Sequence, residues 1–300
     1  QAQRIEGAQW LPNRRGTAPG QWLELEDGHL VALLPGPPRE LVPMVDEFLL
    51  PKLQQWADTT VFHRFLHVVG LTESEVEDRL FPWLHGAANP SMATYIDVGE
   101  VLVRVSVSGE KAIAAKKLEE AVAQAREALG EAVYAVSNLP EEGSLVSTVE
   151  DLLAARGETL SVAESCTGGW IAKLLTDQPG SSRVFLLGAV SYSNQAKEQI
   201  LGVDPKILAS EGAVSEPVAR QMAEGVRNRA GSTYAIATTG IAGPEGGSLE
   251  KPVGLVYTAI ATPQMTQVFR DRFRGERDLV RIRAAKMALS RLRLAILRQG

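Results

Sequence analysis

The sequence predicts a multi-domain α/β protein, and three observations support this. Its 300 residues are 45% hydrophobic and 22% charged, which is enough apolar material for two or three domains. From residue 144 to the end, short apolar runs alternate with amphipathic runs, as expected for a layered α/β/α domain. Residues 59–140 instead follow the order β-α-β-β-α-β, which predicts a smaller α+β module. Residues 1–58 hold too few elements for a core of their own, so they are either a fragment of an α/β domain or pack on their neighbours.

The N-terminal segment contains a hairpin signal. Residues 22–25 and 29–34 flank Glu26-Asp27-Gly28, and Asp-Gly is a strong turn signal. A proline-rich break then precedes a helix whose apolar face holds Leu41, Val45, Phe48 and Leu49. The stretch 10–16 looks like a loop with no element before it, so we expect the first domain to be missing its beginning.

The middle segment has clear signals for each of its elements. Residues 62–69 alternate like a strand, and the capping box Thr72-x-x-Glu75 opens a helix that runs to Leu84. The later elements are a hairpin of 94–98 and 101–107, a long helix over 110–129 and a strand over 133–136. The segment has neither a basic stripe nor a G-x-x-G clamp. A structural or linking module is therefore a better interpretation than an RNA-binding one.

The C-terminal segment follows a short polar linker at 140–144. Its predicted strands are 159–163, 185–193, 233–238, 253–261 and 267–273. Its predicted helices are 145–156, 170–175, 195–201, 205–210, 215–229 and one from 276 onward. Ser215 is expected to cap its helix, with Pro217 in the first turn. The pattern leaves the strand order open.

A Ser-Cys-Thr-Gly-Gly run at 165–169 lies at a strand-to-helix turn. Such a turn directs backbone N–H groups toward whatever the hydroxyl attacks, and the helix N-terminus favours negative charge there. The other interpretation is an ordinary N-cap, because Ser and Thr are the usual capping residues and glycine allows close packing. The turn alone favours the cap.

No histidine lies in the C-terminal half, since His29, His63, His67 and His85 all precede residue 90. A Ser-His-Asp triad within this domain is therefore excluded, and a nucleophilic Ser165 needs a Lys, Tyr or carboxylate as its base. Tyr192 and Lys197 follow the second predicted strand, and the carboxyl ends of parallel strands form the usual ligand site. The alternative for Lys197 is a solvated surface lysine.

The third strand ends in a glycine-rich loop, 239–248, which could present N–H groups to a phosphate. Alone it is weak evidence, because such a loop is often a flexible connector. Arg277 and Arg281, one turn apart on the last helix, could bind an anion or simply be solvated. Cys166 is a stronger nucleophile than a serine when ionised, yet a single buried cysteine is more often packing material.

Composition excludes several classes of protein. The net charge of −5 gives no general attraction to nucleic acid or to an anionic membrane, so neither partner is expected. Cys166 is the only cysteine, which excludes an intrachain disulfide and fits a reducing, cytoplasmic location. No apolar run reaches the ~18 residues of a membrane span.

Five motifs in order resemble the CinA (competence/damage-inducible) family, in particular its C-terminal nicotinamide mononucleotide (NMN) deamidase domain. The resemblance covers roughly residues 144–300. The motifs are AESCTGG at 163–169, VSYSNQAK at 190–197, GAVSEPVA at 212–219, TGIAGPEGGS at 239–248 and KPVG at 251–254.

The resemblance implies an amidohydrolase that converts NMN to nicotinate mononucleotide and ammonia in pyridine nucleotide salvage. It implies catalytic roles for Ser165, Tyr192 and Lys197, no cofactor, no metal in this domain, and a homodimer. We further expect substrate contacts from two glycine-containing turns and one arginine: Thr167, Gly168, Gly169, Thr239, Gly240, Gly243, Gly246, Gly247, Ser248 and Arg277.

The rest of the chain resembles the same family. Residues 12–20 and 34–40 are similar to the end of its N-terminal molybdopterin-binding-like domain, and residues 59–140 resemble its KH-like linking domain. The family associates the N-terminal domain with ADP-ribose pyrophosphatase activity that depends on a divalent metal, but the motif for it is not in this sequence. Two alternatives stay open: a pyrophosphatase with a vestigial deamidase half, and a nucleotide-sensing binding module.

Overall fold

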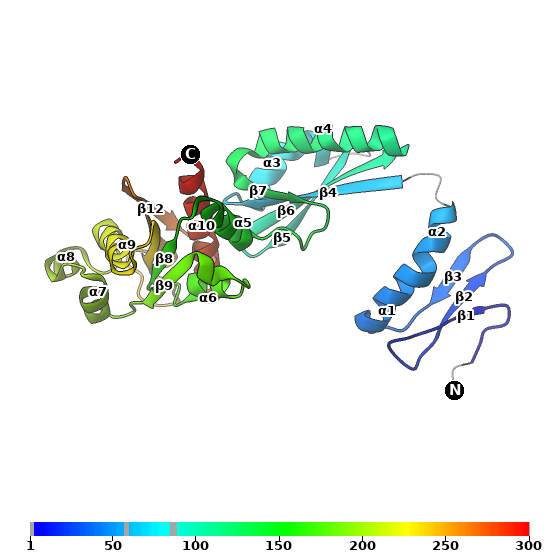
Figure 1. The fold of residues 1–300 in the computed structure, drawn as a ribbon, viewed down its shortest axis with the longest axis horizontal. Coiled ribbons are helices and arrows are strands. Elements are labelled where there is room, and N and C mark those ends of the chain that lie inside the picture. Colours follow the sequence, from blue (N-terminus) through cyan, green and yellow to red (C-terminus); the bar gives the residue numbers. More distant parts are fainter. Residues whose placement is uncertain (1–2, 57–59, 85–88, 300) are drawn as a thin grey trace. The chain divides into compact units, whose positions relative to one another are not determined.

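A computed structural model describes residues 3–56, 60–84 and 89–299 (Figure 1). It divides the chain into two compact units, residues 1–60 and residues 61–300, which are described separately. His85, one of the histidines noted in the sequence, lies outside the described residues.

The N-terminal unit is an antiparallel sheet with a helical segment. Its strands pair in the order β1-β2-β3 and are followed by helix α1, a π-helical turn and helix α2. The bounds are β1 Gln9–Leu11, β2 Gly20–Glu24, β3 Leu30–Leu33, α1 Pro38–Met44, the turn Val45–Leu49, and α2 Leu50–Trp56. The predicted hairpin and helix are confirmed. The prediction of no element around Trp10 is wrong, because Gln9–Leu11 pairs with β2 through long-range hydrogen bonds that a local pattern does not show.

The middle segment has the predicted β-α-β-β-α-β order, and its strands pair in the order β5-β6-β4-β7. The elements are β4 Thr60–Val69, α3 Glu73–Leu84, β5 Ser91–Asp97, β6 Glu100–Gly109, α4 Lys111–Leu129 and β7 Val133–Ser137. Alternate residues of β6 pack under α3 and α4 in one apolar cluster. The capping box is confirmed, since Thr72 N–H donates to the Glu75 carboxylate at 2.7 Å and Glu75 N–H donates to Thr72 Oγ1 at 3.3 Å.

The C-terminal segment is a sheet with strand order β12-β11-β10-β8-β9 and helices on both faces (Figure 1). Strands β9, β8 and β10 are parallel, whereas β11 and β12 form an antiparallel edge. Its strands are β8 Leu160–Glu164, β9 Phe185–Val190, β10 Tyr234–Gly240, β11 Leu255–Ala261 and β12 Thr266–Arg272. Its helices are α5 Leu145–Arg156, α6 Trp170–Thr176, α7 Asn194–Leu201, α8 Pro205–Glu211, α9 Glu216–Ala230 and α10 Arg277–Leu297.

The two faces of this sheet carry different side chains. On the face that packs against α5, α6 and α10, the central strands present larger aliphatic residues such as Val162, Ile236 and Ile260. On the face against α7, α8 and α9 they present alanines, including Ala163 and Ala237. Small residues let a helix approach the sheet closely, whereas aliphatic side chains fill a thicker layer. The predicted layered α/β/α architecture is confirmed.

Ser215 differs from its prediction. It occupies the N-cap position of α9, but its side chain makes no capping bond. Its hydroxyl instead donates to the carbonyl of Gly212 at 2.9 Å, in the preceding turn.

Helix α10 connects the C-terminal sheet to the middle module. It packs on the sheet through Ala285, Leu289 and Leu292. On another side, the Lys286 ammonium lies 3.0 Å from the Asp97 carboxylate and 2.7 Å from that of Glu100. One helix therefore contributes to both the core of one domain and the boundary with the other.

Among the helices in the described ranges, none combines the length and apolar character needed to span a bilayer.

Candidate active site

The three parallel strands end at one edge of the sheet. Glu164, the last residue of β8, lies opposite Val190 of β9 and Thr238 of β10. The segments that follow these strands therefore start side by side, which brings together the serine turn, the Tyr192–Lys197 segment and the glycine-rich loop. This is the edge at which open α/β sheets bind ligands.

Glu164 caps helix α6. Its buried carboxylate accepts hydrogen bonds from the N–H groups of Gly169, Ile171 and Ala172 at 3.0, 3.1 and 2.8 Å. The helix N-terminus is thus satisfied by a carboxylate, which also suits the helix dipole. The interpretation of Ser165 or Thr167 as the N-cap is wrong, because neither hydroxyl contacts these N–H groups. Ser165 is left available for another role.

Arg281 fixes the backbone of the serine turn. Its guanidinium donates twice to the carbonyl of Thr167, at 3.2 and 3.1 Å, and lies 5.4 Å from the centre of the Trp170 ring. Gly168 has a φ of +62°, and a Cβ there would lie 2.9 Å from the Arg281 guanidinium. Arg281 therefore holds the turn and is not the free anion-binding residue that the sequence allowed.

Lys197 is buried beside Ser165. Its side chain is only 1% exposed, and Nζ lies 3.1 Å from Ser165 Oγ. The ammonium also lies 2.8 Å from the Ser191 carbonyl and 3.4 Å from the Tyr192 carbonyl. Within the part of the chain that the structure describes, it makes no ion pair with a carboxylate. The alternative of a solvated surface lysine is wrong.

Burial without a counter-charge lowers the pKa of Lys197 below that of a free lysine, because desolvation disfavours the charged form. A neutral amine next to a hydroxyl can accept its proton. The pair Ser165–Lys197 therefore has the composition and distance of a nucleophile and its base.

Cys166 points into a different environment. It is buried in an apolar cluster with Ala242, Val256, Val280 and Ala284. Burial raises the pKa of its thiol to about 12, so the thiol is neutral at physiological pH. Adjacent residues at the end of β8 thus have separate roles: the serine hydroxyl meets the lysine, while the cysteine mainly contributes packing.

A pocket of about 290 Å³ opens over the Ser165–Lys197 pair. Tyr192, 61% exposed, and Arg277 lie at its margin, and the Arg277 guanidinium donates to the Tyr192 hydroxyl at 3.0 Å and to the Gly243 carbonyl at 2.7 Å. These two bonds connect the start of α10 to the glycine-rich loop and to the segment after β9. The pocket is therefore lined by the Ser165 hydroxyl, the Lys197 ammonium and the Arg277 guanidinium.

Comparison with known proteins places this chain in a family. The model of the CinA C-terminal domain matches residues 142–296, and the model of the damage-inducible protein CinA KH domain matches residues 63–135. A competence-damage inducible protein of Caldanaerobacter subterraneus is 45% identical over 287 residues, covering 96% of this chain and 68% of the relative. This chain belongs to the CinA family.

Other relatives agree with this assignment. The competence-damage inducible protein of Moorella thermoacetica is 44% identical, covering 94% of this chain and 68% of its own length. The solved structure of competence damage-inducible protein A from Klebsiella pneumoniae is 36% identical, with a TM-score of 0.51, and covers 52% of this chain and 97% of its own. We refer below to residues 142–296 as the CinA domain and to residues 63–135 as the KH-like domain.

Half of the substrate-binding residues expected from the sequence line the pocket of the CinA domain. Those that line it are Thr239, Gly240, Gly243, Gly246 and Arg277. Those that do not are Thr167, Gly168, Gly169, Gly247 and Ser248. Thr167 is instead buried with its hydroxyl 2.7 Å from that of Thr238, and the Ser248 hydroxyl accepts from Lys251 N–H at 3.0 Å. Thr167 and Ser248 therefore make hydrogen bonds within the protein and do not line the pocket.

Three further residues line the pocket that were not expected from the sequence. Ala213, Val214 and Glu245 also face the pocket. The Thr239 hydroxyl donates to the Ala213 carbonyl at 2.7 Å, which draws the loop before α9 to the sheet edge. The motif at 212–219 was a usable signal for this loop.

Across the residues that the structure describes, no three His, Cys, Asp or Glu side chains gather in a way that could hold a metal ion.

Proposed function

We propose that the CinA domain hydrolyses the carboxamide of NMN, giving nicotinate mononucleotide and ammonia. The observation that supports this best is the buried Lys197 ammonium 3.1 Å from Ser165 Oγ, without a carboxylate partner among the described residues. A lysine in this position is suited to acid–base chemistry on the serine. The choice of NMN as the substrate rests on the resemblance of the motifs in this domain to the NMN deamidase domain.

The first half of the reaction forms an acyl-enzyme. Neutral Lys197 takes the proton of the Ser165 hydroxyl while Oγ attacks the carboxamide carbon. The tetrahedral intermediate then collapses, the C–N bond breaks, and the Lys197 ammonium returns the proton to the departing amide nitrogen, which leaves as ammonia. Lys197 is neutral again, and the nicotinoyl group is held as an ester on Ser165.

The second half releases the product. Water attacks the ester carbon and gives a proton to Lys197. The carbon–Oγ bond breaks, and Ser165 recovers its proton from Lys197. The product is formed as the carboxylic acid and loses its proton to the released ammonia, so one water is consumed and a carboxylate and an ammonium ion are formed.

Backbone N–H groups can stabilise the oxyanion. The N–H groups of Cys166 and Thr167 adjoin the Ser165 hydroxyl in the chain, and both interact with the Cys166 sulfur, which is only a weak acceptor. We assign them to the oxyanion, an interaction typically worth ~3 kcal/mol per donor.

Arg277 and the glycine-rich loop are assigned to the 5′-phosphate. Arg277 lines the same pocket as the serine, and a guanidinium binds a phosphate with paired hydrogen bonds. Tyr192 accepts a hydrogen bond from the Arg277 guanidinium at 3.0 Å, so its hydroxyl lies beside the group assigned to the 5′-phosphate.

The test is to incubate the full chain with NMN and measure ammonia and nicotinate mononucleotide together. We expect both products in equal amounts, none with Ser165→Ala, and much less from nicotinamide riboside, which lacks the phosphate. Hydroxylamine should trap the nicotinoyl group as a hydroxamate in the wild type. Binding of NMN without ammonia release would reject the reaction and favour a nucleotide-sensing module.

A further inference from the structure

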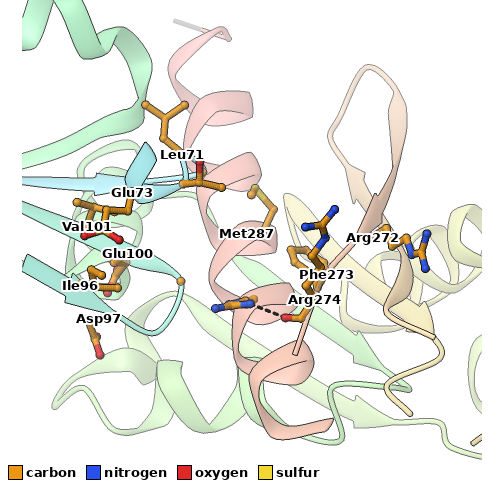
Figure 2. A pocket seen from close by; sticks show the side chains of 14 residues that line it. Leu71, Glu73, Ile96, Asp97, Glu100, Val101, Arg272, Phe273, Arg274 and Met287 are labelled. Atoms are coloured by element: carbon orange, nitrogen blue, oxygen red, sulfur yellow. Dashed lines mark hydrogen bonds between the residues drawn. The ribbon is translucent and has the colours of Figure 1, made fainter. Parts of the chain in front are cut away.

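A second cavity, larger than the candidate active site, lies where the KH-like domain meets the CinA domain. Its volume is about 570 Å³, against about 290 Å³ for the pocket over Ser165. It is bounded by the turn after β4, the β5–β6 hairpin, the end of β12 and the middle of α10 (Figure 2). A volume of this size is typical of small-molecule sites.

The CinA-domain wall of this cavity is positively charged. Arg274 and Arg283 both line it, and neither has a carboxylate partner among the described residues. Arg283 donates to the backbone carbonyl of Arg274, and this bond is drawn in Figure 2. The bond holds the Arg283 guanidinium against the backbone of Arg274, but the carbonyl does not neutralise the positive charge of Arg283.

The opposite wall belongs to the KH-like domain and contains acidic residues. The Lys286 ammonium pairs with both Asp97 and Glu100, which leaves one excess negative charge on these three residues. Glu73, at the start of α3, has no ion-pair partner in the described ranges. An unpaired carboxylate opposite two unpaired guanidinium groups suits a ligand that has an anion at one end and hydroxyl or amine donors at the other.

Apolar side chains lie between the two charged walls. Leu71, Ile96 and Val101 come from the KH-like domain, and Phe273 and Met287 from the CinA domain (Figure 2). Ile96 is 66% exposed, which is unusual for an isoleucine. A flat ring would cover this surface, and aromatic and thioether groups are favourable partners for it.

We propose that this cavity is a second binding site, for a nucleoside monophosphate. The phosphate is bound by Arg274 and Arg283, the base packs on Phe273, Ile96 and Met287, and Glu73 accepts from the ribose hydroxyls or an exocyclic amine. The site is separate from the pocket over Ser165, so its occupation does not depend on the proposed reaction.

The test is isothermal titration calorimetry of the full chain with AMP, GMP, CMP and UMP. At least one of the four is expected to bind. Adenosine and the other nucleosides should bind at least about tenfold more weakly, because they lose a charge-assisted contact worth more than 1.4 kcal/mol. Arg283→Gln and Arg274→Gln should each weaken the nucleotide by a similar factor. The Arg274 side chain is exposed, so its variant is expected to fold normally, and thermal melting will show this.

Arg277→Gln is the matched control, because this residue lies on the same helix but lines the other pocket. It should leave at least one binding site with wild-type affinity, even if a nucleotide also enters the candidate active site. No binding by any of the four nucleotides would overturn the proposal. Nucleosides that bind as tightly as nucleotides would also overturn it. The same holds if Arg274→Gln leaves nucleotide binding unchanged, or if Arg277→Gln abolishes all nucleotide binding.

Discussion

Two lysines of the CinA domain are withdrawn from water in opposite electrostatic environments. Lys197 lies under the candidate active site and faces a hydroxyl and two carbonyl oxygens. Lys286 lies at the boundary with the KH-like domain, its side chain 15% exposed, and faces the carboxylates of Asp97 and Glu100. Burial lowers the pKa of Lys197, whereas Glu100 and Asp97 outweigh burial and raise the pKa of Lys286. The partner charge, and not burial alone, decides whether a lysine can act as a base.

The two lysines also contribute to stability with opposite pH dependence. Between the lowered folded pKa of Lys197 and the ordinary value of 10.5, the unfolded chain binds a proton that the folded chain does not, so this contribution to stability rises with pH. For Lys286 the folded pKa lies above 10.5, so its stabilisation is present at lower pH and is lost as pH rises through the folded pKa. Lys197 therefore reduces stability at neutral pH, whereas Lys286 increases it.

The largest expected effect is on turnover. Lys197→Ala and Ser165→Ala should each lower kcat for NMN by about three orders of magnitude or more, and the double variant should be little worse, because the two groups act as one unit. Lys286→Ala should keep kcat within a few-fold. Circular dichroism verifies folding of each variant. Equal losses of kcat in Lys197→Ala and Lys286→Ala would contradict the different roles assigned to the two lysines.

The pH profile is the next test. If Lys197 is the base, kcat/KM should rise with pH and level off above an ionisation lower than 10.5, because only the neutral amine accepts the serine proton. Lys197→Arg should abolish most activity, because arginine stays protonated. Lys286→Arg keeps the charge that pairs with Glu100 and should leave the profile unchanged. Near-normal turnover by Lys197→Arg would reduce Lys197 to a positioning residue.

Removing the charge of Lys286 should mainly affect stability. Lys286→Met leaves the half-buried Glu100 without its partner and should lower the free energy of unfolding by about 1–3 kcal/mol, less than for a fully buried pair because Asp97 is exposed. Urea denaturation at neutral pH measures the change. Lys286→Arg should recover most of it. An unaltered midpoint in Lys286→Met would show that the pair contributes nothing.

Removing the KH-like domain should change the surroundings of Lys286 and leave those of Lys197 intact. A chain that begins at Gly143 lacks both carboxylate partners of Lys286 but keeps every described contact of Lys197. The Klebsiella pneumoniae structure matches about half of this chain over 97% of its own length. A chain of that length therefore folds as a CinA domain without the KH-like domain. We expect the short chain to release ammonia from NMN within a few-fold of the wild-type rate. A well-folded but inactive short chain would mean that the active site requires both domains.

The smallest expected effect is at Cys166, the residue next to the proposed nucleophile. Cys166→Ala should retain most activity, because its thiol is neutral and packs in an apolar cluster. Stability should fall by about 1 kcal/mol, as for a small loss of buried volume. The rate of ammonia release and the melting temperature measure the two effects. Loss of activity comparable with that of Ser165→Ala would transfer the nucleophilic role to the cysteine.

The order of the helices and strands could be predicted from the sequence, and so could the sheet edge at which the candidate site forms. Apolar runs, the Asp27-Gly28 turn, the Thr72–Glu75 capping box and glycines after helices are local signals, and the structure confirms the elements that they predict. The meeting of three strand ends also followed from a general rule for parallel strands.

The remaining features depend on contacts between distant residues. Nothing near Lys197 in the sequence shows that its side chain is buried, because Ser165 lies 32 positions earlier. Nothing in the sequence near Glu164 indicates that its carboxylate caps α6, because this role requires the turn to fold back over it. Strand β1 exists because β2 pairs with it, and the cavity lined by Arg283 exists because two domains meet there.

Helix α10 also affects how this protein is made on the ribosome, because it follows every other described element in the chain. Until it emerges, the sheet face that holds Val162, Ile236 and Ile260 lacks one of its covering helices, and Asp97 and Glu100 lack their cation. At about 5–20 residues per second, the roughly 25 residues from Phe273 to Leu297 take about 1–5 s to synthesise. During that time the nascent CinA domain exposes an apolar surface to chaperones and to neighbouring nascent chains. Helix α10 therefore completes both the core of the CinA domain and its contact with the KH-like domain in one late step.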